Sequence, residues 1–202
     1  MITISVAVCT YNRERNLPPL IAALRAQSCP VPFEILIVDN NSSDTTSNTV
    51  ETLIGQHAVP VRYVREPIQG ITHARNRAIA ECLRSDYMAF IDDDELPGTG
   101  WLDASYRALH DEGAECVGGR IDVSVPTQGF PAWITQELMG FLGRLDYGET
   151  PFWITDLETP VWSGNIAYRT SLFRNNQTLR FDARYNRIGT GVGGGEDAVM
   201  FR

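Results

Sequence analysis

Apolar and polar residues alternate between residues 4 and 123 in a pattern that predicts strands separated by helices. In the predicted strands Val, Ile and Leu form nearly continuous runs, which is typical of strands buried on both faces. In the predicted helices apolar residues recur three and four positions apart, as at Ala74, Ala78 and Cys82. This alternation predicts an α/β sandwich with a mainly parallel sheet. The predicted strands are 4–11, 33–40, 61–66, 86–94 and 114–123, and the predicted helices are 16–28, 41–57, 71–85 and 100–113.

The pattern is less regular from residue 124 onward. Proline, glycine and aromatic residues are frequent between 124 and 160, with a helix expected at 131–143 and a strand at 161–168. A glycine-rich stretch at 186–197 then leads into a short helix that ends the sequence. This last helix has little to pack on, so we expect the native protein to continue past Arg202.

Composition and charge narrow the class of protein. The 202 residues are enough for a single domain with its own core. The net charge of −8 argues against a general nucleic-acid-binding protein. No apolar run approaches the roughly 20 residues that a membrane-spanning helix needs, and the first residues are expected to form a strand rather than a signal peptide. The cysteines are isolated from one another, which is typical of reduced thiols in a cytoplasmic protein.

Polar residues gather where three of the predicted strands end, at 10–12, 39–41 and 92–95. In open α/β sheets ligands bind beyond the carboxyl ends of the strands, so these segments are expected to line one site. Any one of them alone would be explained as a helix cap or a turn. It is their coincidence at three strand ends that predicts a binding site.

The third of these segments contains four consecutive acids, Asp92 to Glu95. Two unit charges about 6 Å apart repel by roughly 3 kcal/mol at an effective dielectric near 20, so the crowding needs compensation. If the strand continues through the acids, Asp92 and Asp94 face one side and Asp93 the other. An Asp-x-Asp pair suits Mg²⁺ or Mn²⁺, which also take phosphate oxygens from a substrate. A solvated acidic turn is the alternative interpretation.

Other nucleotide and metal motifs are absent from the sequence. No Walker A loop is present, no Gly-x-Gly-x-x-Gly follows the first strand, and the acids lack the spacing of an EF-hand. A P-loop NTPase and a dinucleotide-dependent dehydrogenase are therefore not supported.

Six segments, in their order along the chain, resemble those of family 2 glycosyltransferases of the GT-A fold. They are VAVCTYNRERNL, EILIVDNNSSDTT, GITHARNRAI, FIDDDELPGTGWL, GNIAYRTSLF and GGGEDAVMFR. Each is a modest signal, but together they cover nearly the whole chain. The resemblance implies a Rossmann-like three-layer sandwich in a single domain, 1–202. Within it, 1–98 would be the nucleotide-sugar-binding half and 99–202 a less regular acceptor half, truncated at its C-terminus.

The resemblance also implies which residues hold the nucleotide. Asp39 matches the family's acid that hydrogen-bonds the base, and Asn41 lies beside it. Arg75 and Asn76 match a helical segment near the base and diphosphate. The segment implied to hold base and ribose comprises Thr10, Tyr11, Asn12 and Glu14.

Two acidic motifs are implied to carry the chemistry. Asp92 and Asp94 match the Asp-x-Asp motif and are the implied metal ligands, with Asp92 also near the ribose or sugar. Asp93 between them is assigned to the same donor site. The pair Glu196 and Asp197 matches the Glu-Asp motif that supplies the catalytic base. We favour Asp197 as the base, with Glu196 expected to hold donor or acceptor hydroxyls.

The implied activity is inverting, metal-assisted transfer of a sugar from a nucleotide-diphosphosugar to a hydroxyl of a glycan, lipid-linked or other acceptor. Mn²⁺ or Mg²⁺ is the implied metal, and Asp39 suits the uracil of a UDP-sugar. We expect a bacterial, cytoplasmic enzyme of cell-surface polysaccharide biosynthesis, with peripheral association at the inner face of the membrane left open. Two alternatives are kept: a nucleotide-sugar-binding protein without turnover, and a nucleotidyltransferase. The latter would carry a glycine-rich basic loop after its first strand, and residues 10–16 are not such a loop.

Overall fold

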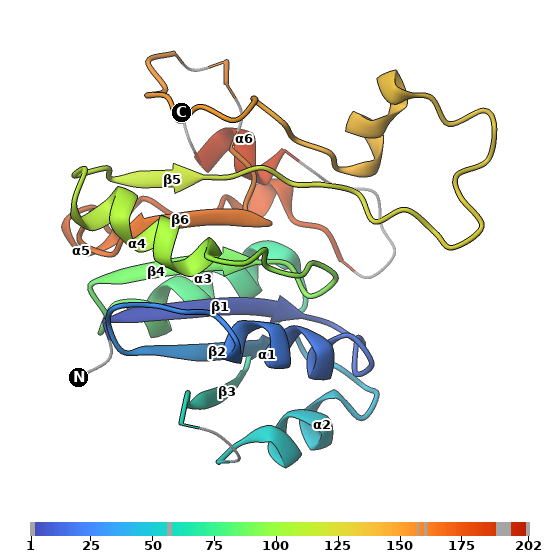
Figure 1. Ribbon diagram of the computed structural model, residues 1–202. Coiled ribbons are helices and arrows are strands. Elements are labelled where there is room, and N and C mark those ends of the chain that lie inside the picture. Colours follow the sequence, from blue (N-terminus) through green and yellow to red (C-terminus); the bar gives the residue numbers. More distant parts are fainter. Residues whose placement is uncertain (1–2, 56–57, 157, 160, 189–194, 201–202) are drawn as a thin grey trace.

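One sheet forms the centre of the fold in the computed structural model, which describes residues 3–55, 58–156, 158–159, 161–188 and 195–200. Its strand order is β3-β2-β1-β4-β6-β5 (Figure 1). Strands β1 to β4 are parallel to one another, and β6 is antiparallel to both β4 and β5. The predicted mainly parallel sheet is therefore confirmed. The strands are β1 Ile4–Thr10, β2 Phe33–Asp39, β3 Val61–Arg65, β4 Tyr87–Ile91, β5 Cys116–Gly118 and β6 Asn165–Arg169.

Helices cover both faces of the sheet, which confirms the predicted three-layer sandwich. One face packs against α1 (Leu17–Arg25), α2 (Thr46–Leu53) and α4 (Trp101–His110), which lie in front of the sheet in Figure 1. The other face packs against α3 (Ile71–Cys82) and against the short helices α5 (Ser171–Asn175) and α6 (Glu196–Met200). Among the described residues, no helix is long and apolar enough to cross a membrane.

The pleat of the strands divides the core between these two faces. In β2, Ile35 and Ile37 contact the α1 side, whereas Leu36 and Val38 contact the α3 side. All four are fully buried. A strand covered on both faces is apolar along its centre, which is why residues 35–38 of β2 form a continuous Ile, Leu and Val run.

The fourth strand is shorter than the sequence pattern predicts. β4 ends at Ile91, and the acids after it form a turn in which the Glu95 N–H donates to the Asp92 carbonyl oxygen at 3.2 Å. Pleat alternation therefore does not apply to Asp92, Asp93 and Asp94.

Two predicted elements of the second half also differ from the structure. The strand expected at 114–123 is reduced to Cys116–Gly118, which lies at the edge of the sheet and pairs only with β6. Its last residue, Gly118, packs closely against Val161, since a Cβ atom there would lie 2.1 Å from Val161 Cγ1. The helix expected at 131–143 is a 3₁₀ helix, η1 (Gln136–Leu142). A second 3₁₀ turn, η2, spans Ala183–Tyr185.

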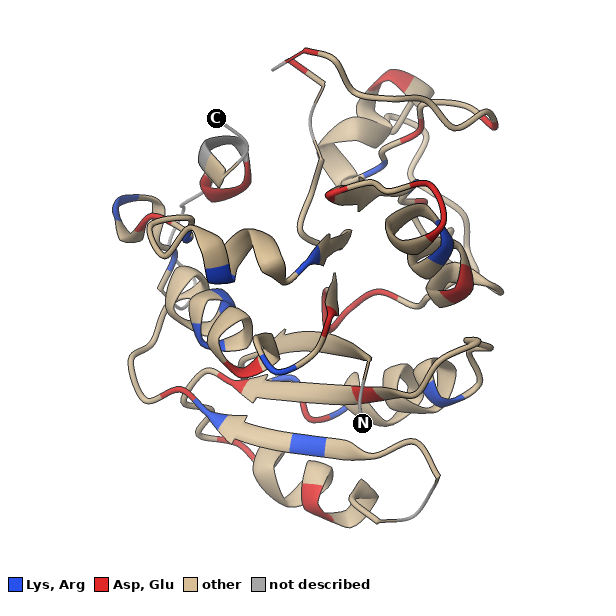
Figure 2. Cartoon of the chain, turned by 90° about the vertical axis from the view of Figure 1, so that its left-hand side faces the viewer, with Lys and Arg blue, Asp and Glu red and all other residues tan. Residues whose placement is uncertain are grey.

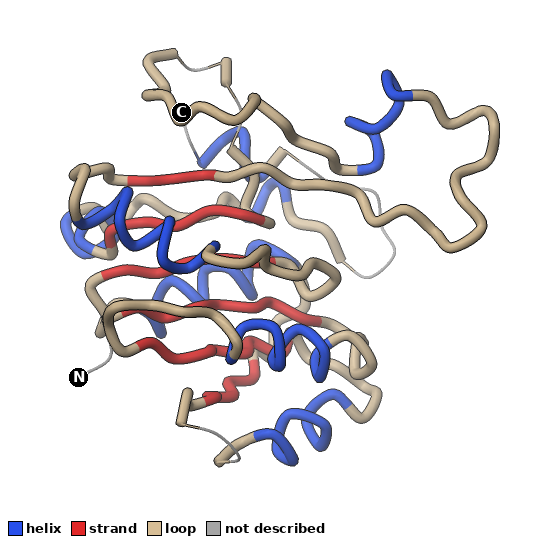
Figure 3. Tube along the Cα trace, viewed as in Figure 1, coloured by secondary structure: helices blue, strands red, loops and turns tan. Residues whose placement is uncertain are grey.

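Residues 119–164 form a long arm between β5 and β6 that extends beyond the sheet and consists mainly of loop (Figures 1 and 3). An isolated bridge between Ile121 and Leu145 closes its base. The arm exposes large aromatic side chains, among them Trp133, Phe141 and Trp153. Basic and acidic residues are interspersed over the rest of the fold rather than gathered on one face (Figure 2).

Candidate functional site

A cleft of about 800 Å³ opens where β1 and β4 end and α3 begins. All three polar strand ends contribute residues to it, so the structure brings together the segments that were expected to line one site. Its lining residues are Cys9, Thr10, Tyr11, Asn12, Arg13, Asn40, Gln69, Ile71, Ala74, Arg75, Asp92, Asp93, Asp94 and Arg187.

Asn12 fixes the wall of the cleft that follows β1. Its backbone has a φ of 53°, a left-handed conformation that asparagine tolerates better than most residues. Its side-chain Oδ1 accepts hydrogen bonds from the backbone N–H groups of Ser43 (2.8 Å) and Asp44 (3.3 Å). Its own N–H donates to Ser42 Oγ at 2.9 Å. Asn12 thus ties the loop after β1 to the loop after β2.

Asp39 lies behind this wall rather than on the cleft surface. Its side chain accepts from the Ser42 N–H at 2.8 Å and from the Tyr63 hydroxyl at 2.6 Å, and the residue is buried. Burial and the bond to Asp39 raise the pKa of Tyr63. Asn41, with a left-handed φ of 64°, directs its Oδ1 to the Arg65 guanidinium at 2.6 Å. Neither Asp39 nor Asn41 is among the residues that line the cleft.

Glu14 and Asn76 also make contacts outside the cleft lining. The Glu14 carboxylate accepts from the backbone N–H of Thr45 at 3.1 Å, at the start of α2. The Asn76 amide donates to the Phe181 carbonyl at 2.8 Å and accepts from the Phe181 N–H at 2.9 Å. Asn76 therefore fastens the segment around Phe181 to α3.

Burial raises the pKa values of three acids of the turn, Asp92, Asp93 and Glu95. Asp93 accepts a 2.6 Å hydrogen bond from the Thr10 hydroxyl, and burial raises its pKa to about 6. Burial and the charges of Asp92 and Asp94 raise the pKa of Glu95 to about 8. Gly164 allows this packing, because a Cβ atom there would lie 2.7 Å from Glu95 Oε1.

Arg75 is the central cation of the site. Its side chain is 6% exposed, and its guanidinium lies 5.4 Å from the centre of the Phe181 ring. It approaches three carboxylates: Glu196 at 2.7 Å, Asp197 at 3.2 Å and Asp92 at 3.6 Å. These acids come from two motifs more than 100 positions apart, which the fold brings together around one arginine.

Asp197 is the more accessible acid of the Glu-Asp pair. Its side chain is 24% exposed, against 12% for Glu196. Its second oxygen, Oδ2, accepts a long 3.4 Å hydrogen bond from the Ser163 N–H. The Ser163 hydroxyl is buried without a hydrogen-bond partner in the described part of the chain.

The acids of the turn can supply only part of a metal's coordination shell. Asp92 and Asp94 retain 43% and 56% of their side-chain exposure, so their oxygens remain accessible. Within the described ranges no group of three or more His, Cys, Asp or Glu residues could hold a metal ion by itself. Such an incomplete donor set fits Mg²⁺ or Mn²⁺ bound together with substrate phosphates and water, as these ions commonly are.

Arg13, Asn40, Gln69 and Arg187 also line the cleft, although the sequence argument gave none of them an individual role in the site. Asn40 lies at a strand end, and its Oδ1 accepts from the Gly70 N–H at 2.6 Å. Gln69 precedes α3, and its amide nitrogen is buried without a partner among the described residues. Arg187 comes from a segment whose sequence carries no strand-end signal. Asn40 lies within the strand-end segment 39–41, which the sequence argument did expect to line the site.

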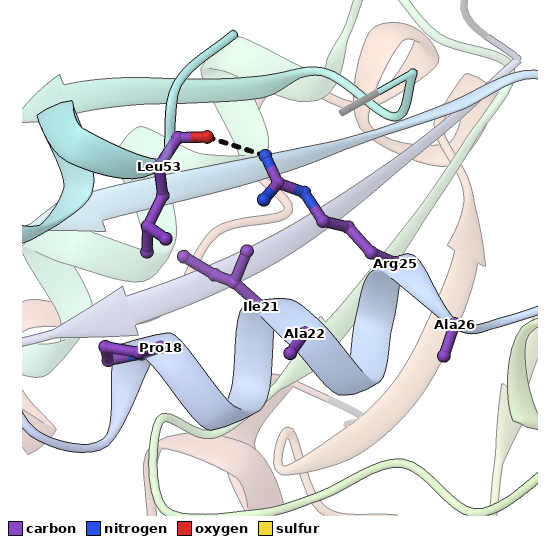
Figure 4. A pocket seen from close by; sticks show the side chains of 6 residues that line it. All are labelled: Pro18, Ile21, Ala22, Arg25, Ala26 and Leu53. Atoms are coloured by element: carbon purple, nitrogen blue, oxygen red, sulfur yellow. Dashed lines mark hydrogen bonds between the residues drawn. The ribbon is translucent and has the colours of Figure 1, made fainter. Parts of the chain in front are cut away.

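A second, smaller hollow of about 300 Å³ lies between α1 and the end of α2 (Figure 4). Its walls are mostly apolar, and Arg25 donates to the Leu53 carbonyl oxygen at 2.6 Å across it. It lacks the acids and exposed amides that distinguish the first cleft, so it is not the candidate site.

Comparison with known proteins gives consistent matches. The family described as "Glycosyl transferase family 2" matches residues 5–176, well over half of the chain. The succinoglycan biosynthesis protein ExoM of Rhizobium meliloti is 28% identical over 211 residues, which cover 98% of this chain and 60% of that protein.

Solved structures match in fold. Staphylococcus aureus TarS 1–349 in complex with UDP has a TM-score of 0.72 at 21% identity, covering 99% of this chain and 54% of that one. The mannosyltransferase PcManGT of Pyrobaculum calidifontis, in complex with GDP-Man and Mn²⁺, has a TM-score of 0.64 at 17% identity, covering 98% and 50%. The chain thus spans roughly half to three-fifths of the length of these proteins.

Proposed function

The chain belongs to glycosyl transferase family 2, and from that premise we propose that it transfers a sugar from a nucleotide-diphosphosugar to an acceptor hydroxyl. A UDP-sugar is the favoured donor, which the UDP complex of TarS supports. The proposed acceptor is a hydroxyl of a glycan or of a lipid-linked saccharide. The proposed location is the cytoplasm or the inner face of the membrane.

The observation that most supports this function is the cluster around Arg75. A glycosyl transfer by single displacement needs an acidic donor site on one side of the sugar and a carboxylate base on the other. Asp92 of the donor-site turn and Asp197 of the Glu-Asp pair both lie within 3.6 Å of the same guanidinium. Two acidic motifs so close together, beside a cleft large enough for a nucleotide-sugar, suit that arrangement.

In the proposed reaction, the acceptor hydroxyl attacks the anomeric carbon and its proton passes to an oxygen of Asp197. The C–O bond to the diphosphate breaks, and the configuration at the anomeric carbon inverts. Asp197 suits the role of base because it is the more exposed acid of its pair. Glu196, held at 2.7 Å by Arg75, would orient hydroxyl groups of donor or acceptor.

Asp92 and Asp94 would hold a divalent metal together with the donor's phosphates. When bound, such a cation neutralises the negative charge that develops on the departing diphosphate. Thr10, Tyr11 and Asn12 would contact the base and ribose from the wall of the cleft. Asp39, Asn41, Glu14 and Asn76 would support that wall and α3 through the hydrogen bonds described above, rather than line the cleft.

Product analysis tests the proposal. The protein is incubated with UDP-sugars and GDP-sugars, with Mn²⁺ or with chelator, and with and without candidate saccharide acceptors. Glycosyl transfer from these donors releases a nucleoside diphosphate, transfer of their nucleotidyl group releases a sugar 1-phosphate, and a binding protein releases neither. We expect nucleoside diphosphate, acceptor-dependent and lost in chelator, and NMR of the product is expected to report an inverted anomeric centre.

The Asp197→Asn variant tests the assignment of the base. We expect it to keep nucleotide affinity and to lose about 100-fold or more in transfer rate, because general base catalysis contributes roughly 10²- to 10⁴-fold. Asp182→Asn, an acid paired with Arg184 away from the cleft, is the matched control. Transfer at near wild-type rate in Asp197→Asn would exclude this carboxylate as the base.

A further inference from the structure

Three arginines line the cleft. They differ in whether their positive charge is already paired with carboxylates of this chain. Arg13 approaches Asp94 at 3.5 Å. Arg75 is buried among three carboxylates at 2.7 to 3.6 Å. Their positive charge is therefore compensated by this chain's own acids, and an incoming anion gains little from either.

Arg187 differs from both. Its side chain makes no ion pair or hydrogen bond with the described part of the chain, and the residue is exposed on the cleft surface. Burial raises the pKa of Asp92, and the charges of Arg75 and, more weakly, Arg187 oppose that rise. The guanidinium of Arg187 is thus within electrostatic range of the acidic turn without being paired to it.

The backbone that carries Arg187 is firmly attached to the start of α3. The Ile71 N–H donates to the Arg187 carbonyl oxygen at 3.2 Å. Next to it, Asn186 Oδ1 accepts from the N–H and the hydroxyl of Thr72, at 3.2 and 3.1 Å. Gly70 makes room for this amide, since a Cβ atom there would lie 2.0 Å from Asn186 Nδ2. An exposed side chain on a fixed backbone is suited to receive a ligand.

The ligand class follows from the charge. A nucleoside diphosphate entering this cleft meets three aspartates, and it needs cationic groups that are not already neutralised. A guanidinium offers a planar fork of N–H donors that matches phosphate oxygens in pairs. We propose that Arg187 binds the diphosphate of the donor, while Arg75 serves as the internal counter-ion of Asp92, Glu196 and Asp197. This assignment rests on the proposed function, because it takes a nucleotide-sugar as the ligand of the cleft.

Calorimetric titration of the wild-type chain and the Arg187→Ala variant with UDP and UMP, and with GDP and GMP, in Mg²⁺ tests the assignment. Loss of a charge-assisted hydrogen bond lowers affinity about 10-fold or more. We expect that loss for the nucleoside diphosphate, and a loss below about threefold for the monophosphate, which lacks the second phosphate. Arg184→Ala is the matched control, because Arg184 is three positions away, 81% exposed and paired with Asp182. It is expected to bind as the wild type does.

The outcomes separate this inference from the proposed function. If the wild type binds no nucleoside diphosphate, the proposed donor class is wrong and the assignment falls with it. If the wild type binds UDP or GDP and Arg187→Ala binds it equally well, only the assignment of Arg187 is overturned. An equal loss for mono- and diphosphate would also overturn it, since that pattern indicates a general effect on the cleft. The thermal unfolding midpoint of each variant checks that the fold is intact.

Discussion

The Gly70→Ala substitution is expected to destabilise the fold and to disturb the cleft at the same time. Gly70 has a φ of 141°, in a region that residues with a side chain rarely adopt, and it precedes the first turn of α3. Its added Cβ would lie 2.0 to 2.5 Å from the amide group of Asn186. That amide is the end of a flexible side chain, so we expect it to swing away rather than the backbone to move.

The magnitude follows from what is lost. Forcing alanine into a backbone conformation of this kind costs about 1 to 3 kcal/mol. Displacing the Asn186 amide breaks its two hydrogen bonds from Thr72, each worth about 1 kcal/mol net. The sum is roughly 3 to 5 kcal/mol, which is a large part of a typical stability of about 5 to 15 kcal/mol. The domain would still fold, with a lower midpoint.

Urea unfolding of matched variants measures this effect. Gly113→Ala is the control, because Gly113 also has a positive φ, 79°, but its Cβ would meet nothing within 4 Å. It is expected to cost about 1 kcal/mol. Asn186→Ala removes the obstructing amide, so the double variant Gly70→Ala/Asn186→Ala is expected to cost less than the sum of the two singles. Equal losses for Gly70→Ala and Gly113→Ala, with strict additivity in the double variant, would refute the reasoning.

Two further predictions concern titration and buried charge. The raised pKa of Glu95 means that the folded chain keeps this proton up to about pH 8, whereas the unfolded chain releases it near its ordinary value of 4.5. Glu95 therefore favours the folded state in acid, and its contribution is lost as the pH rises through 8. Glu95→Gln is expected to flatten the fall in unfolding free energy between pH 5 and 8, and an unchanged slope would contradict the argument. Separately, Glu34 is buried between Arg62 and Arg84, at 3.1 and 2.7 Å. Glu34→Ala is expected to cost about 3 kcal/mol in urea unfolding, because Arg62 would lose a buried partner, and a loss below 1 kcal/mol would count against that pairing.

The apolar runs predicted the sheet well, because a strand covered on both faces is restricted to mainly apolar residues. β2 shows this most clearly, since all its residues from Phe33 to Asp39 are buried. The arm at 119–164 was predicted poorly for the opposite reason. Few of its residues are buried, so no regular spacing of apolar positions is required of it.

The candidate site was predictable where it depends on strand ends, and less so where it depends on side-chain direction. Thr10 and Asp93 follow different strands that end at the same edge, so their meeting follows from topology. The direction of Asn76 toward Phe181 depends on a segment 105 positions later. The backbone of Arg187 is fixed by a hydrogen bond to the first turn of α3, and no local sequence pattern predicts that bond.

Helix α3 serves as a shared support for both halves of the molecule. Its N-terminal half carries Arg75, whose guanidinium contacts Asp92 as well as the Glu-Asp pair. If the proposed roles hold, occupancy of the donor site and the placement of the base are thermodynamically linked through this guanidinium. A ligand that draws Arg75 away from Asp197 changes the free energy of the base, and a change at the base alters donor affinity by the same amount. Substitutions selected for their effect on the acceptor would therefore also change the affinity for the nucleotide.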